Sequence, residues 1–161
     1  MTDSRKIQVY VVDTNILINF SVWIPIKLNK FFWSFMEDSL KDGKWVLLDI
    51  VVNEIQFDID LVAWCQKQKR NGLVRKISID DRKRGIEINR DHPMIDQATM
   101  KSETDTYLIA YAERNAMVVF SREGFKKPTE TLFKIPDVCK ILKIFCFKKP
   151  QKYLDAIGFS N

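Results

Sequence analysis

IQVYVVDTNILINF, from Ile7 to Phe20, decides the fold because it joins an apolar strand to a helix through one charged residue. Its first six residues are β-branched, aromatic and almost continuously apolar, which is typical of a strand buried on both faces of a parallel sheet. Asp13 follows directly, and Thr14 or Asn15 is a suitable N-cap for the helix that comes next. The segment therefore predicts a strand whose carboxyl end meets the start of a helix.

The same alternation of strand and helix continues along the chain. We expect further strands at Trp45–Ile50, Ala116–Ser121 and Ile144–Phe147, and helices at Phe31–Leu40, Glu54–Asn71, Thr104–Asn115, Ile135–Leu142 and Tyr153–Ile157. The stretch from Ile77 to Met100 stays open, because it begins with the alternation of a strand and continues with helical spacing. These patterns predict an α/β fold, a three-layer α/β/α sandwich with a mostly parallel central sheet, in a single domain over residues 1–161.

The composition sets broad limits on function. The 161 residues carry a formal net charge of +5, with a pI near 9.1, which is compatible with a polyanionic partner without requiring one. The start lacks the apolar core of a signal peptide and no apolar run is long enough to span a bilayer, so we expect a soluble, cytoplasmic protein with no membrane contact. Three cysteines without CxxC spacing indicate neither a disulfide framework nor a zinc knuckle.

Four acidic residues fall where predicted strands end or helices begin. Asp13 ends the first strand, Glu54 opens the helix after the second, Asp105 lies in the first turn of a later helix, and Glu123 follows the next strand. Sites in parallel sheets form at the carboxyl ends of the strands, where loops converge. Carboxylates gathered there repel one another, and a hard cation such as Mg²⁺ or Mn²⁺ is the natural compensation.

A purely structural interpretation of these acids is also open. An acid in the first turn of a helix is favourable through the helix dipole alone, so Glu54 and Asp105 taken singly are consistent with capping. Asp13 is different, because a charge directly after a buried apolar strand is costly unless something pairs with it. The four acids together favour a functional site over four separate caps.

Four short motifs resemble those of PIN domains in their order and approximate spacing. They are VVDTNILINF at Val11–Phe20, VVNEI at Val51–Ile55, ETDTYLIAYA at Glu103–Ala112 and VVFSREGF at Val118–Phe125. The resemblance covers most of the chain and implies a nuclease whose acids hold one or two Mg²⁺ or Mn²⁺ ions. It assigns the metal ligands and catalytic acids to Asp13, Glu54, Asp105 and Glu123. It also gives Asn15 the role of orienting Asp13 or a water, and Ser121 that of donating a hydrogen bond to a metal-bound phosphate.

The tail KIPDVCKILKIFCF, from Lys134 to Phe147, resembles one bacterial branch of PIN-like proteins, long catalogued as a domain of unknown function. That branch is similar to the VapC-type toxins. The resemblance implies a metal-dependent endoribonuclease that acts on RNA, with tRNA among the candidates, and a cognate antitoxin partner; PIN domains commonly form homodimers as well. One departure concerns the fourth motif, which has Glu123 where the family usually has Asp. Asp96 and Glu103 are alternative acids.

Basic and aromatic residues supply candidates for contact with a polyanion. Cationic residues cluster in the middle of the chain and are candidates for nucleic-acid binding: Lys67, Lys69, Arg70, Arg75, Arg82, Lys83 and Arg84. A solvated helix face explains the same cluster equally well. Trp23 and Trp33 are able to stack on bases, but their helical spacing favours a core or interface role. The aromatic run from Phe31 to Phe35 is a candidate for an antitoxin or dimer contact.

Two competing functions remain. One is a PIN-fold protein without catalysis that serves as an RNA-binding or scaffold module, which a metal titration distinguishes. The other is a phosphotransfer domain with Asp13 as the nucleophile, although Thr14 and Asn15 follow it rather than a second acid. Because His92 is the only histidine, mechanisms that need two histidines are excluded, and a general base must be a carboxylate or a metal hydroxide.

Overall fold

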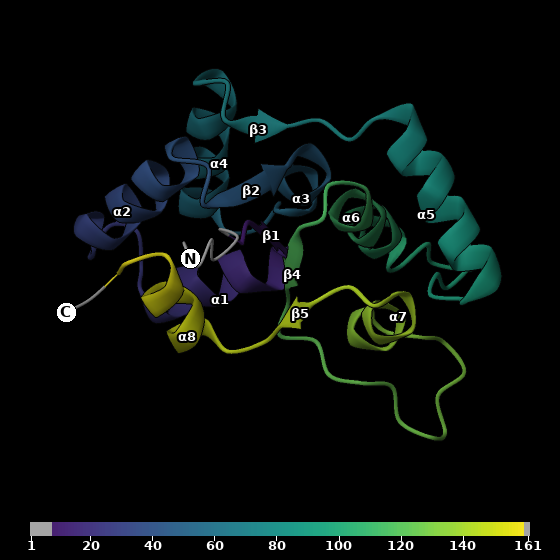
Figure 1. The fold of residues 1–161 in the computed structure, drawn as a ribbon. Coiled ribbons are helices and arrows are strands. Elements are labelled where there is room, and N and C mark those ends of the chain that lie inside the picture. The colour runs from purple at the N-terminus through teal and green to yellow at the C-terminus, as the bar shows by residue number, and fades with distance from the viewer. Residues whose placement is uncertain (1–7, 160–161) are drawn as a thin grey trace, which may run out of the picture.

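The structure, a computed structural model, describes residues 8–159 and places a parallel sheet at the centre of the chain (Figure 1). The sheet has five strands in the order β3-β2-β1-β4-β5, and every neighbouring pair is parallel. The strands are β1 (Tyr10–Val12), β2 (Trp45–Leu48), β3 (Val74–Arg75), β4 (Val118–Phe120) and β5 (Cys146–Phe147). The first strand is confirmed from Tyr10 onward, whereas Ile7 lies outside the described residues.

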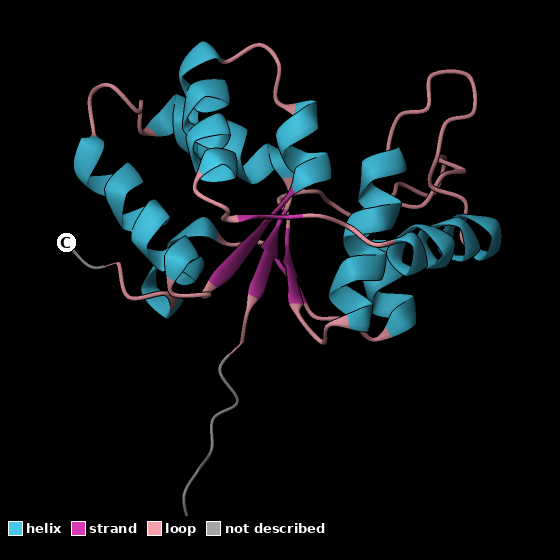
Figure 2. Ribbon diagram, turned by 90° about the horizontal axis from the view of Figure 1, so that it is seen from above, coloured by secondary structure: helices cyan, strands magenta, loops and turns pink. Residues whose placement is uncertain are grey.

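Helices cover both faces of this sheet, as the view in Figure 2 shows. They are α1 (Thr14–Trp23), α2 (Lys30–Lys41), α3 (Asp49–Glu54), α4 (Ile59–Arg70), α5 (Ile79–Asp91), α6 (Glu103–Arg114), α7 (Ile135–Leu142) and α8 (Pro150–Ala156). Helix α6 packs against α5 and α7 on one face, while α1, α3 and α4 pack together on the other side. The α/β/α sandwich with a parallel central sheet is therefore confirmed.

The burial of the central strands follows from their composition. All residues of β1, β2 and β4 are buried, which matches their continuous apolar character and the helices on both faces. Aromatic rings join the layers: the Tyr153 ring of α8 stacks on Phe120 of β4 with centroids 4.4 Å apart and meets Tyr10 of β1 edge to face. No helix within residues 8–159 has the length and apolar character needed to cross a membrane.

The helix predicted from Glu54 to Asn71 is wrong at its start. The strand β2 ends at Leu48, and residues 49–54 form the separate helix α3, so Glu54 ends a helix instead of opening one. The next helix begins only at Ile59, because the Asp58 side chain accepts a hydrogen bond from the Leu61 amide and caps it.

The N-caps of α1 and α6 are Asp13 and Ser102. Asp13 itself, not Thr14 or Asn15, caps α1 by accepting a hydrogen bond from the Thr14 amide at 2.7 Å. Ser102 precedes α6 but has a φ of +73° and makes no side-chain cap hydrogen bond. The strand-end acid Asp13 thus occupies the cap position that the sequence suggested for Thr14 or Asn15.

The open stretch from Ile77 to Met100 is mainly helical. Ser78 caps α5 through a capping box, in which its hydroxyl accepts from the Asp81 amide and the Asp81 carboxylate accepts from the Ser78 amide. The strand β3 (Val74–Arg75) lies just before the alternating isoleucines that suggested a strand. The capping signal therefore outweighs the short alternation.

The aromatic run from Phe31 to Phe35 contributes mostly to the core. Phe32 and Trp33 are buried, and Phe35 packs against Phe159 with ring centroids 4.9 Å apart. Only Phe31 of these four residues is well exposed. Phe31 is therefore the residue of this run that remains free for an antitoxin or dimer contact, whereas Phe32 and Trp33 belong to the core.

Candidate active site

Asp13 is the centre of the candidate site and the most buried of its acids. Its amide continues the sheet by donating to the Phe120 carbonyl at 2.9 Å, which places the side chain at the carboxyl end of β1. The carboxylate is only 4% exposed and accepts hydrogen bonds from the Thr14 amide at 2.7 Å and the Ser121 hydroxyl at 2.8 Å. Both contacts stabilise the charged form and fix its orientation.

Ser121 connects Asp13 to the other polar groups of this edge. Its hydroxyl oxygen accepts from the Glu123 amide at 3.1 Å and lies 3.5 Å from the Asn15 side-chain nitrogen. The Glu123 carboxylate in turn accepts from the Ile135 amide at 3.1 Å, at the start of α7. Asn15, Ser121 and Glu123 are thus brought together with Asp13, and Glu123 is anchored by a helix N-terminus, which favours its negative charge.

Glu54 reaches the same edge from α3. Its carboxylate accepts a 2.8 Å hydrogen bond from the hydroxyl of Thr14, the residue after Asp13. Sequence reasoning missed this role of Thr14, which it treated only as a cap. The signal available was its position: a hydroxyl directly after a strand-end acid lies within reach of whatever acid the neighbouring strand brings to the edge.

Asp105, in the first turn of α6, completes a set of four mutually repelling carboxylates. Its pKa is raised to about 8, mainly by burial and then by the charges of Asp13, Glu123 and Glu54 in that order of importance, while a hydrogen bond from Ser102 acts in the opposite direction. Ser102 therefore serves Asp105, although it does not cap the helix. A carboxyl with this pKa holds its proton in neutral solution unless a cation compensates.

The same repulsion acts on Asp13. Burial is the main reason that its pKa is raised, to about 6, and the charges of Glu123 and Glu54 add to the shift against the hydrogen bonds from Ser121 and Thr14. The four acids singled out in the sequence therefore lie close enough to act on one another. They come from the ends of β1, α3 and β4 and from the start of α6.

The donor chemistry of this cluster fits a hard divalent cation, because carboxylate oxygens are its preferred ligands and the repulsion among them is what such a cation relieves. The carboxylates are not yet arranged around a common point. Within residues 8–159, no three Asp, Glu, His or Cys side chains are arranged as ligands of one ion. The oxygens of Asp13 and Glu54 are instead engaged by Thr14 and Ser121, so a closed set of ligands requires side-chain movement.

The alternative acids lie at other places. Asp96 organises its own loop by accepting from the amides of Ala98 and Thr99 at 2.9 and 3.3 Å. Glu103 accepts from the Tyr107 hydroxyl at 3.1 Å and lines a cavity of about 450 Å³ that also includes Glu54. Glu103 is therefore at the rim of the site, whereas Asp96 serves a turn.

The predicted basic cluster is divided between two parts of the molecule. Lys67, Lys69 and Arg70 lie in the last turn of α4 and Arg75 lies in β3, whereas Arg82, Lys83 and Arg84 lie on α5, at the other side of the sheet (Figure 1). The seven cations therefore do not share one helix, because β3 and the loop after it separate α4 from α5.

Three of these cations have identified contacts. Lys67 pairs with Glu37 at 3.2 Å, and Arg84 pairs with Glu113 at 2.6 Å. Arg82 is different, because it lies over the Tyr107 ring, 5.2 Å from its centroid, and lines the cavity that contains Glu54. Of the seven candidates, Arg82 is placed beside the acids.

The two tryptophans considered for base stacking differ. Trp33 is buried and donates from its indole nitrogen to the Ile24 carbonyl at 2.7 Å, as a core residue does. Trp23 is 51% exposed, with the Arg122 guanidinium 4.6 Å from its ring centroid.

The single histidine, His92, ends α5 and packs edge to face on Phe133. Cys65 and Cys139 are buried free thiols, and Cys146 is half-buried.

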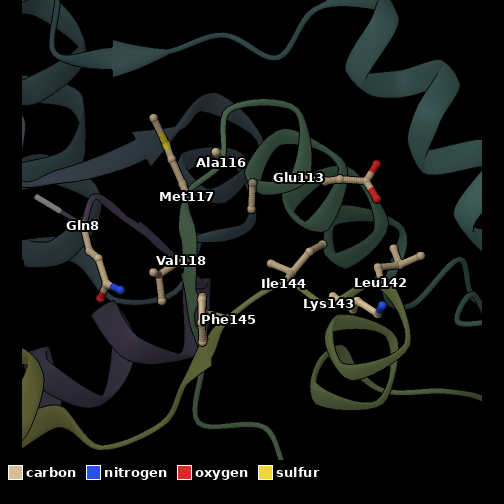
Figure 3. Close-up of a pocket in the computed structure, with 10 residues that line it drawn as sticks. Gln8, Glu113, Ala116, Met117, Val118, Leu142, Lys143, Ile144 and Phe145 are labelled. Carbon is tan, nitrogen blue, oxygen red and sulfur yellow. The ribbon is translucent and has the colours of Figure 1, made fainter. Parts of the chain in front are cut away.

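A separate cavity of about 420 Å³ lies at the opposite edge of the sheet (Figure 3). Met117 and Val118 line it at the start of β4, and Ile144 and Phe145 line it just before β5. Because strands begin at this edge, the cavity is separated from the acids by the length of the sheet. We assign it no part in the chemistry of the carboxylates.

Comparisons with known proteins identify a family and a weak structural likeness. Residues 10–159 match a family described as a domain of unknown function (DUF4411). No curated protein matches the chain. Among solved structures, the crystal structure of FitAcB from Neisseria gonorrhoeae shares 14% sequence identity, covers 86% of this chain and 96% of its own, and gives a TM-score of 0.48.

Proposed function

The chain belongs to the family described as a domain of unknown function (DUF4411), and from this premise we propose that it is a metal-dependent endoribonuclease of the PIN-like, VapC type. The observation that carries the proposal is the convergence of Asp13, Glu54, Asp105 and Glu123, whose charges raise the pKa values of Asp13 and Asp105. Four acids so placed at the carboxyl edge of a parallel sheet are costly to the fold and call for a compensating function.

In this proposal the four carboxylates hold Mg²⁺ or Mn²⁺. When bound, such an ion lowers the pKa of a water and neutralises charge on the phosphodiester. The chain's own residues then have defined tasks. Ser121 and the Thr14 amide hold Asp13 in one orientation, and the Ile135 amide at the start of α7 holds Glu123.

Proton transfer in this site falls to carboxylates or to water. The only histidine, His92, is the C-cap of α5 and packs on Phe133. Asn15 lies next to Ser121 and donates toward it, so it is placed to orient a water or a phosphate oxygen near Asp13. No covalent intermediate is required, because hydrolysis of a phosphodiester proceeds by direct attack of water.

The proposed substrate is RNA, with tRNA as a candidate, and the support for it is the resemblance to PIN-domain toxins. On this proposal the chain is the toxin of a bacterial toxin-antitoxin system, acts in the cytoplasm, and has a cognate antitoxin as partner; a homodimer is a further expectation. Among the seven cations singled out in the sequence, Arg82, which lines the cavity of Glu54, is the one best placed to meet a phosphate of the bound strand.

A catalytically inactive RNA-binding or scaffold module is the second candidate. The observation that favours it is that no three of the described acidic, His or Cys side chains stand as ligands of one ion. The two functions predict opposite results in a titration with Mn²⁺, because only the nuclease needs the carboxylates to close around a cation.

The test is cleavage of labelled tRNA and single-stranded RNA by the purified chain with Mg²⁺ or Mn²⁺, with and without EDTA. The proposal expects cleavage by the wild type, no cleavage in EDTA, and loss of cleavage in Asp13→Asn. Asp96→Asn is the matched control, since it removes an acid that only organises a turn. Cleavage that survives Asp13→Asn, or a wild-type chain that does not bind Mn²⁺, contradicts the proposal.

A further inference from the structure

Trp23 and Arg122 form a pair at the exposed end of α1, which the carboxylate chemistry does not use. The guanidinium of Arg122 lies 4.6 Å from the centroid of the indole ring, and Trp23 is 51% exposed. The other three tryptophans, Trp33, Trp45 and Trp64, are at most 7% exposed. A large aromatic ring left in solvent under a cation therefore stands out from the other tryptophans.

Hydrogen bonds connect this pair to the acids. Arg122 directly follows Ser121, whose hydroxyl donates to Asp13, and the Arg122 amide donates to the Asn15 side-chain oxygen at 3.4 Å. The backbone of Arg122 is thus fixed beside the carboxylates, while its side chain extends toward the last residue of α1. The hydrogen bonds of Ser121 and Asn15 therefore determine where the Arg122 side chain begins.

Arg122 has no carboxylate partner among the ion pairs of residues 8–159, although Glu123 is its neighbour in the sequence and Ser121, on its other side, binds Asp13. Its charge is directed to an aromatic face instead. A guanidinium stacked on a ring keeps its N–H donors at the edge, where they are able to bind a phosphate. The indole offers an apolar surface on which a nucleobase stacks.

We propose that Trp23 and Arg122 form a subsite for single-stranded RNA next to the carboxylates, in which Trp23 stacks on a base and Arg122 binds a backbone phosphate. This inference rests on the proposed nuclease function. Ten residues of helix, about 15 Å at 1.5 Å per residue, separate Asp13 from Trp23 along α1. Trp23 is therefore a positioning residue, and the stacked base is remote from the phosphate that is cleaved.

Binding without cleavage is the direct test. The full chain in EDTA is titrated with a single-stranded RNA oligonucleotide, with the same oligonucleotide carrying abasic sites, and with a duplex, while tryptophan fluorescence is recorded. Because Trp23 is the exposed tryptophan, we expect the single strand to quench the emission, and the abasic strand and the duplex to leave it nearly unchanged. Trp23→Phe removes this quenching.

The variants separate the two contacts. Trp23→Ala is expected to weaken binding of the single strand by roughly five- to 150-fold, the range given by loss of one stacked base, and to leave binding of the abasic strand unchanged. Trp23→Phe, which keeps an aromatic face, restores most of the affinity in an anisotropy measurement. Arg122→Gln weakens binding of both strands and reduces the dependence on salt by about one phosphate contact.

Phe31→Leu and Arg90→Gln are matched controls, since they change an exposed aromatic residue and an exposed cation elsewhere. A thermal melt of each variant shows whether it is folded. If the single strand does not bind the wild type, or if folded Trp23→Ala binds it as tightly as the wild type does, the subsite is overturned.

The outcomes also distinguish this inference from the proposed function. Metal-dependent cleavage with an unchanged KM in Trp23→Ala rejects the subsite and leaves the nuclease intact. Trp23-dependent binding by a chain that never cleaves RNA supports the subsite and rejects the nuclease. If both hold, Trp23→Ala raises KM much more than it lowers kcat, because the base contact is the same in the ground state and the transition state.

Discussion

The Ser121 hydroxyl donates a 2.8 Å hydrogen bond to the buried carboxylate of Asp13, and so joins the ends of two neighbouring strands. In Ser121→Ala the carboxylate loses a partner that lowers its pKa. We expect a loss of stability of about 1–3 kcal/mol in urea unfolding at pH 8, since a buried acceptor is left unpaired. Ser39→Ala removes another buried hydroxyl far from the acids. Only Ser121→Ala should raise the apparent pKa of Asp13.

The stability of the metal-free chain should fall as the pH rises. The folded-state pKa values of Asp13 and Asp105 are about 6 and about 8, both above the ordinary aspartate value of 3.8. The folded chain therefore binds more protons than the unfolded chain between about pH 4 and pH 8, and its stability declines across that window. The shift at Asp13 alone corresponds to roughly 3 kcal/mol.

Urea unfolding in EDTA at pH 5 and pH 8 measures this decline. Asp13→Asn should make the dependence on pH shallower, because the asparagine does not titrate. Addition of Mn²⁺ at pH 8 should raise the unfolding midpoint of the wild type and not that of Asp13→Asn. A wild-type stability that increases between pH 5 and pH 8 would show that the pKa values of these acids are not raised.

Asp81 should contribute strongly to the stability of the contact between α5 and α6. Its buried carboxylate completes the capping box with Ser78 and pairs with Arg114 of α6 at 2.6 Å. Asp81→Ala removes the cap contact and leaves Arg114 without this partner, so we expect a loss of about 2–4 kcal/mol. Asp80→Ala, next to it and more exposed, should cost under about 1 kcal/mol. Equal losses in chemical denaturation would contradict the assignment.

Gly85→Ala should destabilise the chain, although alanine is the better helix former. A Cβ at this position would lie 2.6 Å from Cδ1 of Tyr107 and 3.3 Å from the Thr106 carbonyl oxygen, so α5 and α6 would have to separate. We expect a net loss of about 1–2 kcal/mol, in place of the usual gain of about 1 kcal/mol. Lys83→Ala, at an exposed position of the same helix, should change the melting temperature little.

The parts of the structure that the sequence predicted are those fixed by local patterns. The apolar run before Asp13 specified a buried parallel strand, and the amphipathic residues 104–115 specified α6. The acids were found because strand ends in a parallel sheet share one edge. Glu54 was placed at the wrong end of a helix, since the stop at Ile55 and the cap at Asp58 depend on packing as well as on sequence.

Contacts between distant segments could not be predicted from the sequence. The hydrogen bond from Thr14 to Glu54 joins residues 40 positions apart, and only the crossing of the chain brings them together. The division of the basic cluster has the same origin, because α4 and α5 are close in sequence but lie at different sides of the sheet. The exposure of Trp23 depends on which helix faces are covered, and helical spacing alone favoured the core.

The order of the strands has a consequence for synthesis of the chain. The central strand β1 is made first, but its neighbour β4 follows more than a hundred residues later, after β2 and β3. Such long-range pairing makes folding slow, since the loop between the strands must close before the contacts form. On the ribosome, Asp13 therefore has no Ser121 to bind until more than a hundred further residues have been made. A nascent chain is accordingly unable to assemble the carboxylate cluster before Glu123 has been synthesised.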